Sequence, residues 1–166
     1  MEGLRFLFVD DEPHILQAVL RQVRHHFRAW SPRIQADVES DPRRAIELIR
    51  SRPYAVVVSD YRMPGLTGVE VLSEARQCLP TAARVMLSGQ VDRDGLAAAI
   101  NAAQVHRFLV KPWCDAELMA ALEAGLAHHQ TECQQALSTA PPSAPPGAGQ
   151  QQAAAVSDPD ANRPPA

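Results

Sequence analysis

The chain has 166 residues, of which 46% are hydrophobic and 21% charged, a composition typical of a protein that folds around one core. Its formal net charge of -3 provides no basic field for nucleic-acid phosphates, so no direct nucleic-acid partner is expected. The three cysteines form no C-x-x-C pair and no apolar run is long enough to span a bilayer, so we expect a cytoplasmic protein with no membrane partner, disulfide framework or zinc site.

Apolar runs of strand length alternate along the chain with segments in which apolar residues recur every three to four positions. This alternation predicts a doubly wound α/β domain with five parallel strands and five helices. In chain order, the strands are expected at Leu4–Val9, Ile34–Val38, Ala55–Val58, Arg84–Leu87 and Arg107–Val110. The helices are expected at about Pro13–Phe27, Pro42–Ile49, Val69–Leu79, Arg93–Ala103 and Asp115–Gln134, with Asp41 as the N-cap of the second.

The sequence changes character after the last expected helix. Residues 138–166 hold seven of the chain's 14 prolines and no aromatic residue, so this segment cannot build a core. We therefore expect a folded domain over residues 1–134 and a disordered, Pro- and Ala-rich tail over residues 135–166. The same composition leads us to expect no output domain after the last helix.

Polar residues stand at the carboxyl ends of four of the expected strands. Asp10 and Asp11 follow the first strand, Asp60 the third, Ser88 the fourth and Lys111 the fifth. Each of them alone has a plainer interpretation, as a helix cap, a turn serine or a surface lysine. The carboxyl ends of parallel strands meet at one edge of a sheet, however, so these side chains are expected to converge in a single crevice.

The converging charges indicate the chemistry of the crevice. Three carboxylates a few Å apart repel by about 4 kcal/mol per pair at an effective dielectric constant of about 20, so a cation must compensate for them. Mg²⁺ prefers one or two carboxylates, waters and phosphate oxygens, and Lys111 adds a second positive charge. The pattern predicts a site for Mg²⁺ and a phosphoryl group.

Four segments together resemble the receiver domain of two-component response regulators: Val9–Glu12, Ser59–Gly65, Leu87–Gly89 and Phe108–Trp113. The likeness covers about residues 4–130. It implies a flavodoxin-like sheet of strand order 2-1-3-4-5, and it implies a protein that catalyses only its own phosphorylation and dephosphorylation.

The resemblance also implies which residues perform the reaction. Asp60 would be the phosphoacceptor, attacking the phosphohistidine of a sensor histidine kinase or of a phosphotransfer protein. Asp11, Asp60 and the backbone carbonyl of Arg62 would hold Mg²⁺, and Asp10 would bind it through water.

Other positions would respond to the phosphoryl group once it is attached. Ser88 and Lys111 would contact it, and Ser88 and Phe108 would form the switch, although plain strand packing explains Phe108 equally well. Arg62 and Gln90 would tune the lifetime of the phosphoryl group, and the bond between Lys111 and Pro112 would be cis. Trp113 is expected to pack against the last helix or to mark a partner surface.

The output of such a receiver would be a contact with a downstream protein effector. A homodimer through the face of the fourth helix, fifth strand and fifth helix is a further expectation from the resemblance. Two other functions stay open at this point. One is a Mg²⁺-dependent phosphatase with an aspartate nucleophile, and the other is a pseudo-receiver that binds partners without being phosphorylated.

Overall fold

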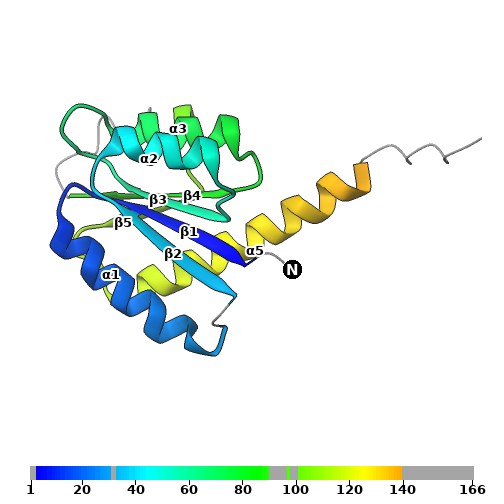
Figure 1. The fold of residues 1–166 in the computed structure, drawn as a ribbon, viewed down its shortest axis with the longest axis horizontal. Helices are drawn as coiled ribbons and strands as arrows, with labels where there is room; N and C mark the ends of the chain where they lie inside the picture. Colours follow the sequence, from blue (N-terminus) through cyan, green and yellow to red (C-terminus); the bar gives the residue numbers. More distant parts are fainter. Residues whose placement is uncertain (1–2, 31–32, 90–96, 98–100, 140–166) are drawn as a thin grey trace, which may run out of the picture.

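Five parallel strands form one sheet in the order β2-β1-β3-β4-β5 (Figure 1). The computed structural model describes residues 3–30, 33–89, 97 and 101–139. The strands are β1 (Leu4–Val9), β2 (Ile34–Glu39), β3 (Val56–Asp60), β4 (Ala83–Ser88) and β5 (Arg107–Val110). All residues of β3 and β4 are buried, as expected for parallel strands covered on both faces. The predicted doubly wound α/β fold and its strand order are confirmed.

Helices cover both faces of the sheet. They are α1 (Pro13–His26), which continues into the 3₁₀ turn η1 (Phe27–Trp30), α2 (Pro42–Ser51), α3 (Gly68–Cys78) and α5 (Asp115–Thr139). Figure 1 shows α2 and α3 on one face, and α1 and α5 on the other. Ala97 and residues 101–103 are helical, and the rest of the predicted fourth helix lies outside the described residues.

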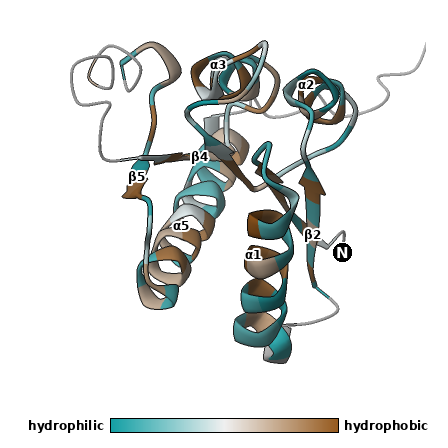
Figure 2. Cartoon of the chain, turned by 90° about the vertical axis from the view of Figure 1, so that its left-hand side faces the viewer, coloured by the Kyte–Doolittle hydropathy of each residue, from teal (hydrophilic) through white to brown (hydrophobic). Residues whose placement is uncertain are grey.

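The core has one apolar cluster on each side of the sheet. Alternate strand residues such as Phe6 and Phe8 face α1 and α5, while Leu7 and Val9 face α2 and α3. Figure 2 shows apolar and polar residues alternating around α1, as in a helix with one buried side. Successive strand residues point to opposite faces of the sheet, so each strand contributes to both apolar clusters and the sheet lies between them.

The last helix is longer than the sequence predicted. It continues to Thr139 instead of ending at about Gln134, and in Figure 1 its final turns extend past the strands. Residues 140–166 lie outside the described residues, so the predicted division at residue 134 stays a prediction. None of the described helices combines the length and apolar content that crossing a bilayer requires.

A carboxylate hub connects the first two strands to the chain before β3. Asp37 of β2 accepts a hydrogen bond from the Tyr54 hydroxyl at 2.8 Å and one from Arg52 at 3.1 Å, and it lies 3.6 Å from Arg5 of β1. Burial and the hydrogen bond to Asp37 raise the pKa of Tyr54 to about 12. The tyrosine therefore stays neutral and keeps donating to Asp37 over the ordinary pH range.

A second polar network lies beside β4 and β5. The guanidinium of buried Arg84 donates to the carbonyls of Ala103 and Ala82 at 3.0 and 2.9 Å. The His106 ring accepts a hydrogen bond from the Arg84 backbone N–H at 2.9 Å and lies against the His128 ring. Burial, the charge of Arg84 and His128 lower the pKa of His106 to about 4.

Candidate functional site

The register of the strands brings the predicted site residues to one edge of the sheet. Asp60 ends β3, Ser88 ends β4, and these two strands pair in parallel with Asp60 opposite Leu87. Asp10 follows β1 directly, and Lys111 follows β5, where its backbone N–H donates to the Ser88 carbonyl at 2.7 Å. The expected convergence arises because each polar residue stands within two positions of a strand end.

Asp10, Asp11 and Asp60 form a cluster of carboxylates. One oxygen from each lies within 4.8 Å of the others, and these are the only described residues that form a three-membered group of this kind. Asp10 is 1% exposed and Asp60 6% exposed, whereas Asp11 is exposed. Hard oxygen ligands arranged in this way, with one side open to solvent, fit a divalent cation such as Mg²⁺.

Lys111 lies beside two carboxylates of this cluster. Its ammonium Nζ is 2.7 Å from Asp10 Oδ2 and 3.0 Å from Asp60 Oδ1, and it lies 4.0 Å from Glu12. The ammonium therefore bridges two buried carboxylates that would otherwise repel each other. A buried charge arrangement is stable only when it is paired in this manner.

The three carboxylates differ in how many oxygens are already occupied. Asp10 accepts a hydrogen bond from the Glu12 backbone N–H at 2.9 Å with Oδ1 and contacts Lys111 with Oδ2. Asp11 accepts no hydrogen bond from the described residues, and Asp60 contacts Lys111 through Oδ1. Asp11 and Asp60 are thus better disposed than Asp10 to bind a cation directly.

Burial and charge shift the pKa values of two groups in the site. Burial raises the pKa of the Asp60 carboxyl above its usual range, the Lys111 ammonium opposes this, and the charges of Asp10 and Asp11 add to the rise. Burial lowers the pKa of Lys111, but its hydrogen bonds to Asp10 and Asp60 outweigh burial and raise it overall. Lys111 therefore stays charged, and its ammonium favours the ionised form of Asp60 against the effect of burial.

The loop after β3 approaches the Asp60 backbone through a glycine that the sequence analysis did not single out. A Cβ atom at Gly68 would lie 2.1 Å from the Asp60 carbonyl oxygen and 3.1 Å from the Ser59 hydroxyl. The Gly68 N–H donates to the Tyr61 carbonyl at 3.0 Å, and a capping box between Thr67 and Glu70 begins α3 there. The S/T-x-x-E spacing before an apolar helix could have indicated this helix start.

The remaining predicted residues lie around the cluster. Ser88 is 1% exposed, and its hydroxyl donates to the Gly89 carbonyl at 3.1 Å. Phe108 is half-buried against the α2–α3 side of the core. Arg62 is exposed two residues after the end of β3, and the Lys111–Pro112 bond is cis. Gln90 lies outside the described residues.

A comparison with protein families shows which family this chain belongs to. The model of the response regulator receiver domain matches residues 6–123, which is more than half of the chain. The chain belongs to this family. The two-component receiver resemblance predicted from the four segments is thereby confirmed.

Curated relatives and solved structures agree with the receiver assignment. The hydrogenase transcriptional regulatory protein HoxA of Cupriavidus necator is 36% identical over 107 residues, which are 64% of this chain and 21% of HoxA. The transcriptional regulator NtrC of Escherichia coli is 32% identical over 91 residues, 54% of this chain and 19% of NtrC. The chain thus spans about one fifth of the length of these relatives. The regulation of transcription is a property of those proteins.

A solved receiver domain matches the fold. The signal receiver domain of an HD domain-containing protein from Pseudomonas fluorescens Pf-5 has a TM-score of 0.72 and 29% identity to this receiver. The match covers 81% of this chain and 95% of the other.

Proposed function

We propose that this receiver accepts a phosphoryl group on Asp60 in a Mg²⁺-dependent reaction. One observation carries the proposal: the buried Asp60 carboxylate lies 3.0 Å from the Lys111 ammonium and shares an open acidic cluster with Asp10 and Asp11. A carboxylate beside fixed positive charge can act as the nucleophile in phosphoryl transfer. The family assignment favours this function over an aspartate-nucleophile phosphatase.

The proposed reaction begins at the Asp60 oxygen that does not contact Lys111. That oxygen attacks the phosphorus atom of a phosphohistidine, the P–N bond breaks, and the histidine nitrogen leaves with the bonding electron pair. Lys111 stays protonated and moves its hydrogen bond from Asp60 to a phosphoryl oxygen, because the high pKa of this ammonium keeps its proton in place. The Ser88 hydroxyl, now donating to the Gly89 carbonyl, would turn to donate to a second phosphoryl oxygen.

The cation site is part of the same proposal. Asp11, Asp60 and the Arg62 backbone carbonyl would bind Mg²⁺ directly, and Asp10 would bind it through water because both of its oxygens already accept donors. Mg²⁺ supplies electrostatic stabilisation of the charge on the transferred phosphoryl oxygens. It would also favour the ionised form of Asp60, whose pKa burial raises.

The partners of the receiver follow from this chemistry as proposals. The phosphodonor would be a sensor histidine kinase or a phosphotransfer protein, and the output would be a contact with a protein effector. Phe108 would couple the site to the β5–α5 side of the domain, where a phosphorylation-dependent homodimer would form, and Arg62 and Gln90 would set the lifetime of the phosphoryl group. We infer a cytoplasmic location from the three unpaired cysteines, which are typical of a reducing compartment.

Acetyl phosphate tests the central step. We expect intact-protein mass spectrometry to show one phosphoryl adduct on the wild type with Mg²⁺ and none with EDTA. Asp60→Asn should form no adduct. Asp41→Asn is the matched control, because Asp41 is the N-cap of α2 and asparagine caps equally well.

Each other outcome counts against a named part of the proposal. A wild type without an adduct would favour the pseudo-receiver, and an adduct on Asp60→Asn would exclude Asp60 as the acceptor. Repeated release of phosphate from many small esters would favour the phosphatase. Light scattering with and without beryllofluoride tests the homodimer, and an unchanged monomer would contradict it.

A further inference from the structure

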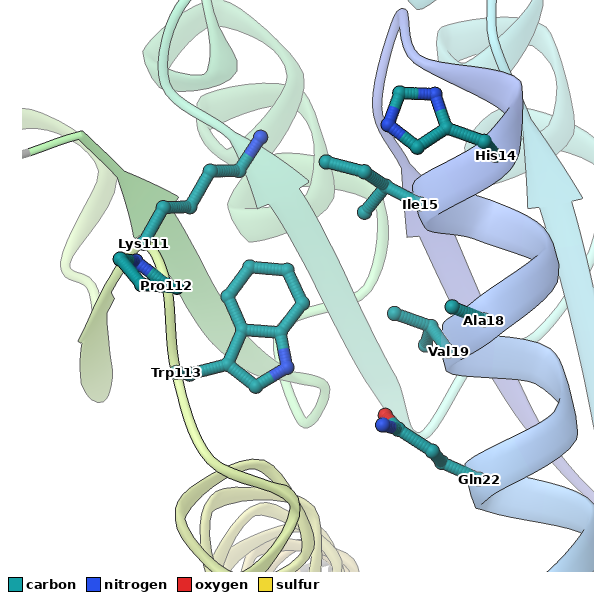
Figure 3. Close-up of a pocket in the computed structure, with 8 residues that line it drawn as sticks. All are labelled: His14, Ile15, Ala18, Val19, Gln22, Lys111, Pro112 and Trp113. Carbon is teal, nitrogen blue, oxygen red and sulfur yellow. The ribbon is translucent and has the colours of Figure 1, made fainter.

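Two hollows border α1. Figure 3 shows the groove between α1 and the segment that joins β5 to α5, a hollow of about 400 Å³ with Ile15 on one wall and Trp113 on the other. Lys111 stands at its end, so this groove adjoins the site of the proposed phosphoryl transfer. The second hollow, of about 440 Å³, lies between α1 and β2, and none of its lining residues takes part in that reaction.

β2 is an edge strand whose outer side has no partner. It pairs with β1 alone, and in Figure 2 it lies beside α1 at the right-hand border of the domain. The Leu4 N–H of β1 donates to the Arg33 carbonyl, so the odd-numbered residues of β2 are those that bond to β1. The N–H and C=O groups of Ile34, Ala36 and Val38 therefore point outwards, and no described residue hydrogen-bonds to them. These groups can pair with a further strand.

β2 also lacks several features that keep edge strands from pairing. It is six residues long, contains no proline or lysine, and stays in continuous register with β1. At the opposite edge, β5 is only four residues long and is followed by Lys111 and Pro112. The two acidic residues of β2, Asp37 and Glu39, lie on the α2–α3 side of the sheet, where each pairs with an arginine. The edge is thus open on its α1 side.

The hollow beside this edge combines an apolar lining with two guanidinium groups. Val23, Phe27 and Ile34 supply the apolar part. Arg24 and Arg28 are exposed, line the same hollow, and form no ion pair or hydrogen bond with another described residue. None of the residues that line the hollow is acidic. The two positive charges are therefore available to a partner with carboxylates.

The spacing of the two arginines indicates which side chains that partner carries. Arg24 and Arg28 are four residues apart, about 6–8 Å along the helix at roughly 1.5–2.0 Å per residue. Side chains on one face of a strand recur about every 6.7 Å. Two acidic residues separated by one position match the two guanidinium groups, and an apolar residue two positions further on fits the apolar lining. Neutral residues suit the other face, which meets Asp37 and Glu39.

A second copy of the chain fits this edge less well. Antiparallel pairing of two β2 strands places both α1 helices on the same face of the joined sheet, because the two-fold axis is then perpendicular to the sheet. Arg24 and Arg28 of one copy would approach the same arginines of the other, and no acidic residue lines the hollow between them. Like charges facing each other oppose such a dimer.

We propose that the outer edge of β2 binds an extended acidic segment of another protein, which adds a sixth strand to the sheet. The backbone of that segment pairs with Ile34, Ala36 and Val38. Its acidic side chains bind Arg24 and Arg28, and an apolar side chain enters the hollow. In strand addition of this kind, main-chain hydrogen bonds give affinity and alternate side chains give specificity. The surface goes beyond the proposed function, since it contains no residue of the phosphoryl-transfer site.

The peptide acetyl-Thr-Glu-Thr-Glu-Thr-Val-Thr-amide is the probe, titrated into the full ¹⁵N-labelled chain and followed by NMR. We expect saturable shifts of the Ala36 and Val38 backbone N–H signals, whereas the Arg43 signal on α2 should stay in place. Two N-methylated peptides test the backbone pairing, one methylated on the Glu and Val nitrogens and the other on the central Thr nitrogens. Only alternate N–H groups of an added strand face β2, so we expect one of the two peptides to lose binding. Loss by both peptides, or by neither, would overturn the proposal.

Paired variants test the charge recognition. We expect Arg24→Gln with Arg28→Gln to bind the unmethylated peptide about fivefold more weakly, as two exposed ion pairs are lost. Arg43→Gln with Arg107→Gln is the matched control, because it removes the same charge from two exposed arginines away from the hollow. Equal affinities of the two double variants would overturn the recognition of acidic side chains by Arg24 and Arg28.

Light scattering of the wild type alone tests the competing occupant. We expect a monomer over the concentration range of the titration. A concentration-dependent dimer that the peptide dissociates would assign the β2 edge to a second copy of this chain and overturn the proposal. A titration without shifts at Ala36 and Val38 would overturn it as well.

Discussion

Gly68→Ala is expected to destabilise the receiver because of the close approach of α3 to the backbone of Asp60. The new Cβ would lie 2.1 Å from the Asp60 carbonyl oxygen, although such contacts essentially never fall below 3.0 Å, so one chain must move by about 0.9 Å (3.0 − 2.1). The obstacle is backbone in a fully buried strand and not the end of a flexible side chain. Overpacking in a core typically costs 1–3 kcal/mol, and we place this case at about 3 kcal/mol.

Thermal unfolding followed by circular dichroism measures the effect. A loss of about 3 kcal/mol corresponds to a fall in Tm of about 10 °C for a domain of this size. Gly89→Ala is the matched control at the end of the neighbouring strand, because a Cβ there meets nothing within 4 Å. Equal Tm values for the two variants would refute the argument that Gly68 is required by contact with Asp60.

Three further predictions concern partly buried titratable groups. Lys111→Met leaves the carboxylates of Asp10 and Asp60 facing each other, so we expect the free energy of unfolding to fall by about 3 kcal/mol. Urea unfolding in the presence of EDTA measures this loss, and Mg²⁺ should restore part of it. No recovery with Mg²⁺ would contradict a cation site. His106 takes up a proton near pH 6.5 in the unfolded chain but only near pH 4 in the folded domain. The free energy of unfolding is therefore highest above pH 6.5 and falls by roughly 2 kcal/mol towards pH 4. His106→Gln should flatten this pH dependence, and an unchanged profile would refute the assignment. Asp37→Ala leaves the buried Tyr54 hydroxyl without its acceptor and should lower the free energy of unfolding by about 1–3 kcal/mol. The same substitution should cost less in a Tyr54→Phe background, which has no hydroxyl to satisfy. Equal losses with and without Tyr54→Phe would contradict this pairing.

The strand-end residues could be placed from the sequence because their positions depend on backbone topology alone. Once four apolar runs are parallel strands, the residues that follow them must share one edge, whichever rotamers they adopt. Asp10, Asp11, Asp60 and Lys111 are therefore found together, as the sequence predicts. The N-cap role of Asp41 followed equally directly from an Asp-Pro pair before a helical pattern.

Contacts between distant side chains could not be placed in this way. The hydrogen bond between Gln22 and Asp115 joins residues 93 positions apart on two helices, and no local pattern pairs them. The groove beside Trp113 depends on how far α1 and the β5–α5 connection stand apart, and the sequence indicated only that this tryptophan packs or marks a surface. The approach of Gly68 to Asp60 likewise depends on the path of an irregular loop.

The pairing of Lys111 with Asp10 connects two residues that are 101 positions apart. The ribosome makes the chain from its first residue onwards, so the three aspartates are synthesised well before the lysine that balances them. A nascent receiver that has emerged only through β4 carries the acidic cluster without its ammonium, and its carboxylates repel. On the proposed function, the Asp60 site is therefore complete only after the chain has been synthesised past β5, because a shorter nascent chain lacks the Lys111 ammonium.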